Sequence, residues 1–241
     1  IKEYAKQMII ILCLLQGSIL SSEAQEQQVW QRYRDKCRRD VSIIDSIPSK
    51  LEKALRWSPT INKEQKEVIR YILWNMVYVE GGTANLGENN DYPINVTSFF
   101  INRYEVSQDE WYVIMGENPS NQHRRNYPVD QINWFDAQRF TKKLSQLSGL
   151  PFRLPFEAEW EYAARGGLKT KNFIYAGSNN AEQVAWFKEK YDNTYVSQET
   201  GRKKPNELGL YDMSGNIYEW CMDWYDKRVP FTGNIDPVIN E

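Results

Sequence analysis

Between residues 46 and 74 the apolar positions recur every three or four residues, which is the period of an amphipathic helix. Pro48 suits the first turn of one helix, with Leu51, Ala54 and Leu55 on a single face. Asn62, followed three residues later by Gln65, has the capping-box spacing and predicts the start of a second helix. The pattern therefore predicts a helical lead-in over residues 25–74.

From Met76 onward the pattern changes to short apolar runs separated by turns, which predicts strands over residues 76–82 and 95–106. Ser107 and Glu110 form a second capping-box pattern, before a short helix that Gly116 ends.

Two more helices are predicted in the same half of the chain. One starts at Asn133 or Trp134 and ends at Gly149, and the other covers residues 156–165 after Pro155. Helices interleaved with short strands indicate an α+β domain rather than a doubly wound parallel sheet, and we place it over residues 75–241.

The N-terminal apolar run, residues 8–20, follows Lys2 and Lys6 and precedes small residues. This order predicts a secretory signal peptide over residues 1–24, cleaved after Ala24. The alternative is an anchored lipoprotein with Cys13 in the lipobox, but Leu12 is too large for that motif. We therefore expect a secreted, periplasmic or cell-surface protein that contacts a membrane only through this segment.

Composition argues against a nucleic acid partner and against metal sites built from several histidines. The net charge is −2, and no basic stripe indicates a nucleic acid partner. The single histidine, His123, excludes metal sites built from two or three histidines, and its loop sequence predicts a surface position. After cleavage two cysteines would remain, Cys37 and Cys221, and the sequence does not decide whether they pair.

The densest stretch, residues 205–224, combines large aromatics with the turn cluster Asp212, Ser214, Gly215 and Asn216. Its oxygen atoms allow two interpretations. Side chains of Asp212 and Glu219, with backbone carbonyls near Gly215 and Ile217, are the hard ligands that Ca²⁺ prefers. Alternatively, the segment is an Asx-type turn between two core segments, with Glu219 satisfied by hydrogen bonds.

Motifs spread over residues 75–228 resemble, in their order, the formylglycine-generating enzyme (sulfatase-modifying factor) family. They are Met76-Val-Tyr-Val-Glu-Gly-Gly, Ile101-Asn-Arg-Tyr-Glu-Val-Ser, Tyr127-Pro-Val-Asp-Gln-Ile-Asn-Trp-Phe-Asp-Ala, Phe152-Arg-Leu-Pro-Phe-Glu-Ala-Glu-Trp-Glu-Tyr-Ala-Ala-Arg-Gly-Gly and Gly209-Leu-Tyr-Asp-Met-Ser-Gly-Asn-Ile-Tyr-Glu-Trp. The resemblance implies an irregular C-type-lectin-like α+β fold.

The resemblance also implies a structural Ca²⁺ site at Asp212, Gly215, Ile217 and Glu219, with a second calcium loop somewhere in residues 184–195. Two local features bear on the helix predicted over residues 156–165. Arg153 is expected to pair with Glu157 or Glu159. The family usually has Thr or Ser where Phe156 stands, so the helix should lose a capping hydroxyl at a cost of roughly 1 kcal/mol.

Family enzymes oxidise a substrate cysteine in a sulfatase to formylglycine with Cu(I) held by two neighbouring thiolates, which are the soft ligands that Cu(I) selects. No such cysteine pair precedes Glu241, so copper would require a pair beyond this chain, and the chain as given should be inactive. Two hypotheses follow. One is a non-catalytic binding or assembly module for a protein, peptide or glycan, and the other is a fragment of a copper-dependent oxidase with a sulfatase-like client. Iron-dependent sulfoxide-synthase relatives are excluded by the histidine count.

Overall fold

The computed structural model describes residues 8–10, 13–14, 60–87, 92–187 and 196–224. Helices and short strands alternate along it, which confirms the predicted α+β class. The helices are α3 (Lys63–Trp74), α4 (Gln108–Met115), α5 (Trp134–Ser148), α6 (Glu157–Ala164), η2 (Gly167–Lys169) and α7 (Ala181–Val184). The strands are β1 (Met8–Ile10), β2 (Cys13–Leu14), β3 (Met76–Val79), β4 (Gly82–Leu86), β5 (Tyr92–Val96), β6 (Phe99–Asn102), β7 (Phe152–Arg153) and β8 (Tyr218–Trp220).

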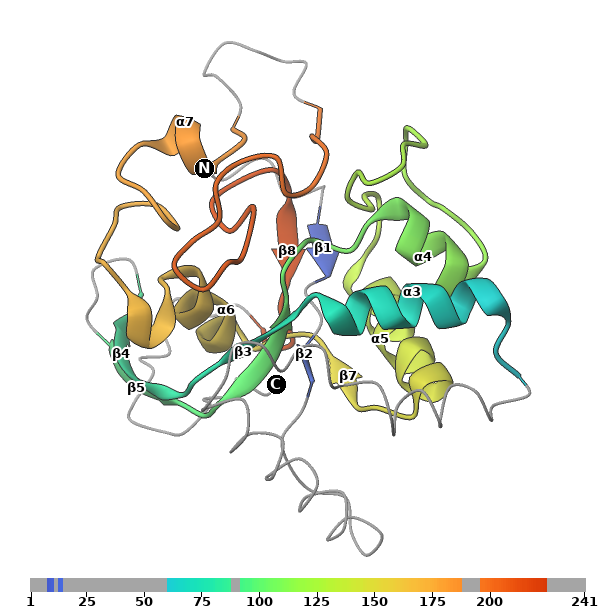
Figure 1. The fold of residues 1–241 in the computed structure, drawn as a ribbon, viewed down its shortest axis with the longest axis horizontal. Coiled ribbons are helices and arrows are strands. Elements are labelled where there is room, and N and C mark those ends of the chain that lie inside the picture. Colours follow the sequence, from blue (N-terminus) through green and yellow to red (C-terminus); the bar gives the residue numbers. More distant parts are fainter. Residues whose placement is uncertain (1–7, 11–12, 15–59, 88–91, 188–195, 225–241) are drawn as a thin grey trace, which may run out of the picture.

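The strands of the described residues form three small sheets. The largest has the order β3-β6-β2-β7, with β6 antiparallel to both β3 and β2, and with β2 antiparallel to β7. Strands β4 and β5 make an antiparallel pair, and β1 lies parallel to β8. The protein thus places its most N-terminal described strands beside β6, β7 and β8, far along the chain (Figure 1).

Strands β1 and β2 come from the run predicted to be a signal peptide. The rest of residues 1–24, including the predicted cleavage site, lies outside the described residues, and cleavage stays a prediction. The first predicted helix, near Pro48, and Cys37 also lie outside them. Within the described residues, no helix has both the length and the apolar character needed to cross a bilayer.

Two hydrophobic clusters flank the central strands. Helices α3, α4 and α5 lie on one side, and α6 and the β4-β5 pair lie on the other (Figure 1). The helix-side core is Ile61, Ile69, Ile72, Leu73, Met76, Phe100, Val106, Trp111, Ile114, Val129, Ile132, Ala137, Phe140, Leu144, Phe152 and Leu154. The hairpin-side core is Val79, Leu86, Ile94, Val96, Phe99, Ile101, Ala158, Tyr162, Ala163, Ala164, Leu210 and Met213. The second predicted helix, α3, therefore packs into the domain that follows it.

The capping boxes predicted at Asn62 and Ser107 are confirmed, and Asn133, where a helix start was predicted, forms a third. Asn62, Ser107 and Asn133 each accept a hydrogen bond from the third residue of the helix they precede, in complete capping boxes. Gly116 and Gly149 end α4 and α5 in the left-handed conformation, where a side chain would be strained.

Helix α6 has a different arrangement at its start. Arg153 pairs with Glu159 rather than Glu157, through two contacts of 2.6 Å between its guanidinium nitrogens and the carboxylate oxygens. Glu157 instead donates its backbone N–H to Asp223 Oδ1, at 2.9 Å. The side chain of Phe156 does not cap the helix, so Asp223, 66 residues away, supplies an acceptor to the first turn. The expected capping loss is therefore offset by a long-range contact.

Asp223→Ala should lower the free energy of unfolding by about 1 kcal/mol, because it removes this acceptor from the helix start. Asp223→Asn keeps an oxygen in the same place and removes a like charge beside Glu157, so it should be as stable as the parent protein. Urea unfolding of the three proteins checks this. Equal destabilisation by both substitutions would show that the contact does not act as a cap.

Candidate functional site: a buried carboxylate cluster and an adjoining surface pocket

The segment from Asn206 to Trp220 is a chain of turns held by its own amides. Asn206 Oδ1 accepts the backbone N–H groups of Leu208 and Leu210, while its Nδ2 donates to the carbonyl oxygens that end α6. Asp212 and Asn216 have positive φ angles, 59° and 67°, which short polar side chains tolerate. The predicted turn cluster is therefore present, and α6 fixes its position.

Gly215 is required by close packing. A Cβ atom at this position would lie 2.2 Å from the carbonyl oxygen of Trp186. The next residue, Asn216, donates its backbone N–H to the same oxygen at 2.8 Å. The loop thus lies directly against the backbone at Trp186.

Three carboxylates gather beneath this loop. Glu105 follows β6 and is 2% exposed, and its Oε2 accepts a hydrogen bond from Asn216 Nδ2 at 2.7 Å. Asp212, also 2% exposed, accepts the backbone N–H of Gly201 at 2.7 Å. Glu219 on β8 accepts the indole N–H of Trp160 at 2.7 Å.

Burial with few compensating donors makes these carboxyls hard to ionise. Burial, followed by the charges of Asp212 and Glu219, raises the pKa of Glu105 well above its usual range, against the donors Asn216 and Ile217. Burial also raises the pKa of Asp212, and raises that of Glu219 to about 8. Glu105 Oε1 and Asp212 Oδ1 are buried, and no donor among the described residues forms a hydrogen bond to either atom.

The carboxylate cluster contains two of the residues predicted to bind calcium, Asp212 and Glu219. It brings Asp212 and Glu219 into electrostatic contact, and the backbone near Ile217 faces Glu105. The two unpaired oxygens suit a cation, but the described residues contain no group of three acidic, histidine or cysteine side chains placed to hold a metal. Calcium at Asp212, Gly215, Ile217 and Glu219 stays a prediction. Most of the second proposed loop, residues 188–195, lies outside the described residues.

Sequence reasoning missed the role of Glu105. Its motif, residues 101–107, was singled out, but no function was assigned to this carboxylate. The signal was that Glu105 stands between Tyr104 and Val106, because an acidic residue buried among such side chains needs a specific partner. Which residue it contacts could not be read from the sequence, since Asn216 lies 111 positions away.

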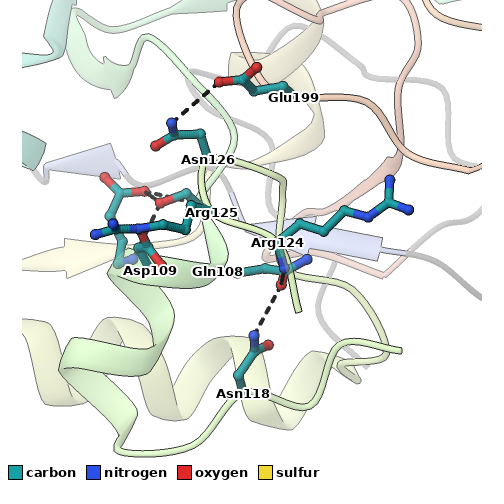
Figure 2. A network of polar contacts seen from close by, with 9 residues as sticks. Gln108, Asp109, Asn118, Arg124, Arg125, Asn126 and Glu199 are labelled. Carbon is teal, nitrogen blue, oxygen red and sulfur yellow. Dashed lines mark hydrogen bonds and ion pairs between the residues drawn. The ribbon is translucent and has the colours of Figure 1, made fainter. Parts of the chain in front are cut away.

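His123 is exposed in the loop after α4, as predicted. Figure 2 shows how that loop is held: Gln108 Oε1 accepts from Asn118 Nδ2 at 3.0 Å and from the backbone N–H of Arg124 at 2.9 Å. Arg125 pairs with Asp109, and Asn126 reaches Glu199. These contacts join α4 to the segment around Glu199, and they hold the loop in place.

A surface pocket of about 210 Å³ adjoins the carboxylate loop. Trp160 and Met213 belong to its lining, and Phe173, Ile174 and Tyr175 form an apolar rim. Ile174 is 75% exposed, and Leu168 on the neighbouring η2 is 59% exposed. Ser214 Oγ accepts the backbone N–H of Ala176 at 2.8 Å, so the turn cluster also positions the rim.

Glu219 should make the stability of the protein depend on pH when a chelator is present. Burial raises the pKa of Glu219 from its ordinary value of 4.5 to about 8, so the folded state holds a proton that the unfolded state releases. The free energy of unfolding should therefore fall as pH rises through this window. Glu219→Gln keeps an acceptor for Trp160 and should give a shallower slope in urea unfolding.

Glu67→Gln is the matched control, because Glu67 is an exposed helical carboxylate. Its slope should equal that of the parent protein. A Glu219→Gln slope as steep as the parent's would contradict the assignment of this proton to Glu219.

Comparison with known proteins agrees with the motif order. The model of the sulfatase-modifying factor enzyme 1-like domain matches residues 63–235. The chaperone protein LppX of Paenibacillus barcinonensis is 33% identical over 201 residues, which cover 63% of this chain and 72% of LppX. A formylglycine-generating enzyme of Thermomonospora curvata is 32% identical over 126 residues, 48% of this chain but only 39% of the enzyme.

Solved structures support the same fold. The crystal structure of CarF superposes with a TM-score of 0.55 at 27% identity, covering 64% of this chain and 82% of CarF. The family match begins at the first residue of α3, in agreement with the packing of that helix into the helix-side core. The chain belongs to the sulfatase-modifying factor enzyme 1-like family, which includes the formylglycine-generating enzymes.

Proposed function

We propose that this protein is a secreted, non-catalytic member of its family that binds an apolar segment of a protein client. The single observation that carries the proposal is the pocket beside the carboxylate loop, with its exposed apolar rim. Exposed aromatic and aliphatic side chains around a hollow are typical of interaction sites.

The size of the pocket supports a peptide side chain as ligand. Sites for drug-sized ligands and cofactors have volumes of roughly 300–1,000 Å³. A volume of about 210 Å³ suits one or two apolar side chains instead. The client would then be held at a few anchor residues.

The charges at the rim are already engaged. Glu161 accepts from the guanidinium of Arg165 at 2.7 Å and from the backbone N–H of Gly87 at 3.0 Å. Glu207 accepts the backbone N–H of Lys171 at 3.0 Å. Because these carboxylates have internal donors, the exposed side chains of Phe173, Ile174 and Tyr175 are the groups of the rim that remain available to a client.

The names of the relatives support a protein as the client. LppX, which is 33% identical to this chain over 201 residues, is named a chaperone, and a chaperone acts on other proteins. The alternative is that the chain is part of a copper-dependent oxidase with a sulfatase client, as the formylglycine-generating enzymes suggest. That chemistry needs two neighbouring thiolates for Cu(I), and the segments around Cys13, Cys37 and Cys221 contain no second cysteine.

Ile174→Asp should weaken binding to a library of immobilised apolar peptides by about tenfold or more, because a charge would have to be desolvated at the rim. The backbone of this loop is held by Asn179, which accepts the N–H of Ile174, so the fold should survive. Tyr112→Asp, on α4 and 56% exposed, is the matched control and should bind like the parent protein.

Equal binding by the Ile174→Asp and parent proteins would contradict the assignment of client binding to the pocket.

Catalysis is tested separately. The protein is incubated with copper and a cysteine-containing sulfatase peptide, and the peptide mass is followed. Formation of an aldehyde product would contradict the non-catalytic assignment and support the oxidase alternative.

We further propose that Ca²⁺ stabilises the loop carrying Asp212 and Glu219. The support is the group of buried carboxylates with raised pKa values and two unpaired oxygens, which a cation would neutralise. Glu105 is electrostatically coupled to Asp212 and Glu219, so it lies beside the expected set of Asp212, Gly215, Ile217 and Glu219 without completing a group of three carboxylate ligands among the described residues.

Calcium should raise the melting temperature relative to EDTA, because a ligand at a hundredfold excess over its dissociation constant adds about 2.7 kcal/mol. The gain should be larger above pH 8 than near pH 6, since the carboxyls must lose protons to bind a metal. Asp212→Asn should reduce the gain. Equal melting temperatures with Ca²⁺ and EDTA at both pH values would leave the segment as a turn only.

A further inference from the structure

Strand β2 occupies a slot one strand wide between β6 and β7. Cys13 lies opposite Ile101 on one side and Arg153 on the other, and Leu14 lies between Phe100 and Phe152. Three residues earlier the same segment, as β1, runs parallel to β8, with Ile9 opposite Glu219. Two short strands from one N-terminal run thus pair in two sheets, β1 with β8 and β2 with both β6 and β7.

The edges of this slot are positioned by contacts that do not involve residues 8–14. Strand β6 pairs with β3 along its whole length. The backbone N–H of Phe152 in β7 is bound by Ser145 Oγ of α5 at 2.8 Å, and Arg153 is paired with Glu159 of α6. Glu219 of β8 is held by Trp160. The slot is therefore preorganised to accept a strand.

The walls of the slot define what can enter it. Phe100 and Phe152 belong to the helix-side core, whereas Ile101 belongs to the hairpin-side core. A strand between β6 and β7 therefore has the helix-side core on the face of Phe100 and Phe152, and Ile101 beside the Arg153–Glu159 ion pair on the other face. Because Glu159 already pairs with Arg153, the slot suits a run of consecutive apolar residues, and an alternating amphipathic strand would bury polar groups.

We propose that the slot between β6 and β7, with the neighbouring edge of β8, is an acceptor for an extended run of consecutive apolar residues from a protein client. In this structure β2 lies between β6 and β7, and β1 lies beside β8. If the N-terminal segment is removed after Ala24, as its sequence predicts, the slot opens in the mature protein. This inference rests on the client binding proposed above and adds a second, strand-addition contact to the pocket.

The test uses disulfide trapping in the full chain with Cys13→Ser, Cys37→Ser and Cys221→Ser as background. Leu14→Pro is added, because proline lacks the N–H needed for strand pairing and so releases the chain's own segment. The probe is the peptide Met-Ile-Ile-Ile-Leu-Cys-Leu-Leu with a lysine tail. Its cysteine should form a disulfide with the Ile101→Cys protein, since directly opposite residues in antiparallel strands have suitable geometry.

Phe100→Cys is the matched control, because neighbouring residues of a strand point to opposite faces. It should trap about tenfold less peptide than Ile101→Cys. Without Leu14→Pro, trapping in the Ile101→Cys protein should fall strongly, because the tethered segment competes at an effective concentration in the millimolar range. A peptide with Asp in place of its third residue should not be trapped.

Absence of an adduct in the Leu14→Pro protein, or equal adducts with both cysteine variants, would overturn the proposal. Binding that still depends on Ile174 would then show that the pocket function stands without the slot. Should Ile101→Cys fail to fold, Tyr218→Cys replaces it, because Tyr218 is 53% exposed and lies opposite Met8. The peptide then carries its cysteine at the first position, and absence of that adduct is equally decisive.

Discussion

The hydrogen bond between Asn216 and Glu105 is the contact on which the C-terminal half of this domain depends. It joins the segment after β6 to the turn before β8, and both residues are buried. A buried carboxylate without a donor would cost several kcal/mol, so Glu105 strongly favours the one loop conformation that brings Asn216 to it. Asn216 in turn donates to Gln198 and accepts from its backbone, which fixes a third segment.

The surface features follow from this buried contact. Gly215 and Asn216 hold the loop against Trp186, and Ser214 binds the amide of Ala176. The apolar rim of the pocket is therefore attached to the carboxylate cluster through a continuous set of hydrogen bonds. Protonation or metal binding in the cluster would act on the same loop that positions the rim, which gives the pocket a physical link to pH and cations.

Local sequence signals predicted local structure well. The capping boxes at Asn62 and Ser107 and the stops at Gly116 and Gly149 depend on residues within one helical turn, and all are present. The motif order also identified the family and its α+β fold. These successes share a cause, because each rests on short-range geometry or on a pattern spread over many positions.

Long-range partners could not be predicted in the same way. The sequence left Glu157 and Glu159 as equal partners for Arg153, and it had no means to assign Asp223 to the start of α6. Such a contact requires the chain to return after 66 residues, and many acidic residues satisfy the same local description. Pairing across the fold is decided by topology and packing, and the candidate site consists mainly of contacts of this kind.

The apolar run over residues 8–20 could not be assigned from sequence alone, because its composition fits both a signal peptide and a buried strand. A signal peptide needs consecutive apolar residues for its central region, and a strand buried on both faces needs the same. Periodicity cannot separate the two, because neither has a polar face. The slot between β6 and β7 is lined by both cores, so it selects by this shared property rather than by a particular sequence. A groove that accepts the chain's own apolar segment in this way has the chemistry to accept that of an incompletely folded client.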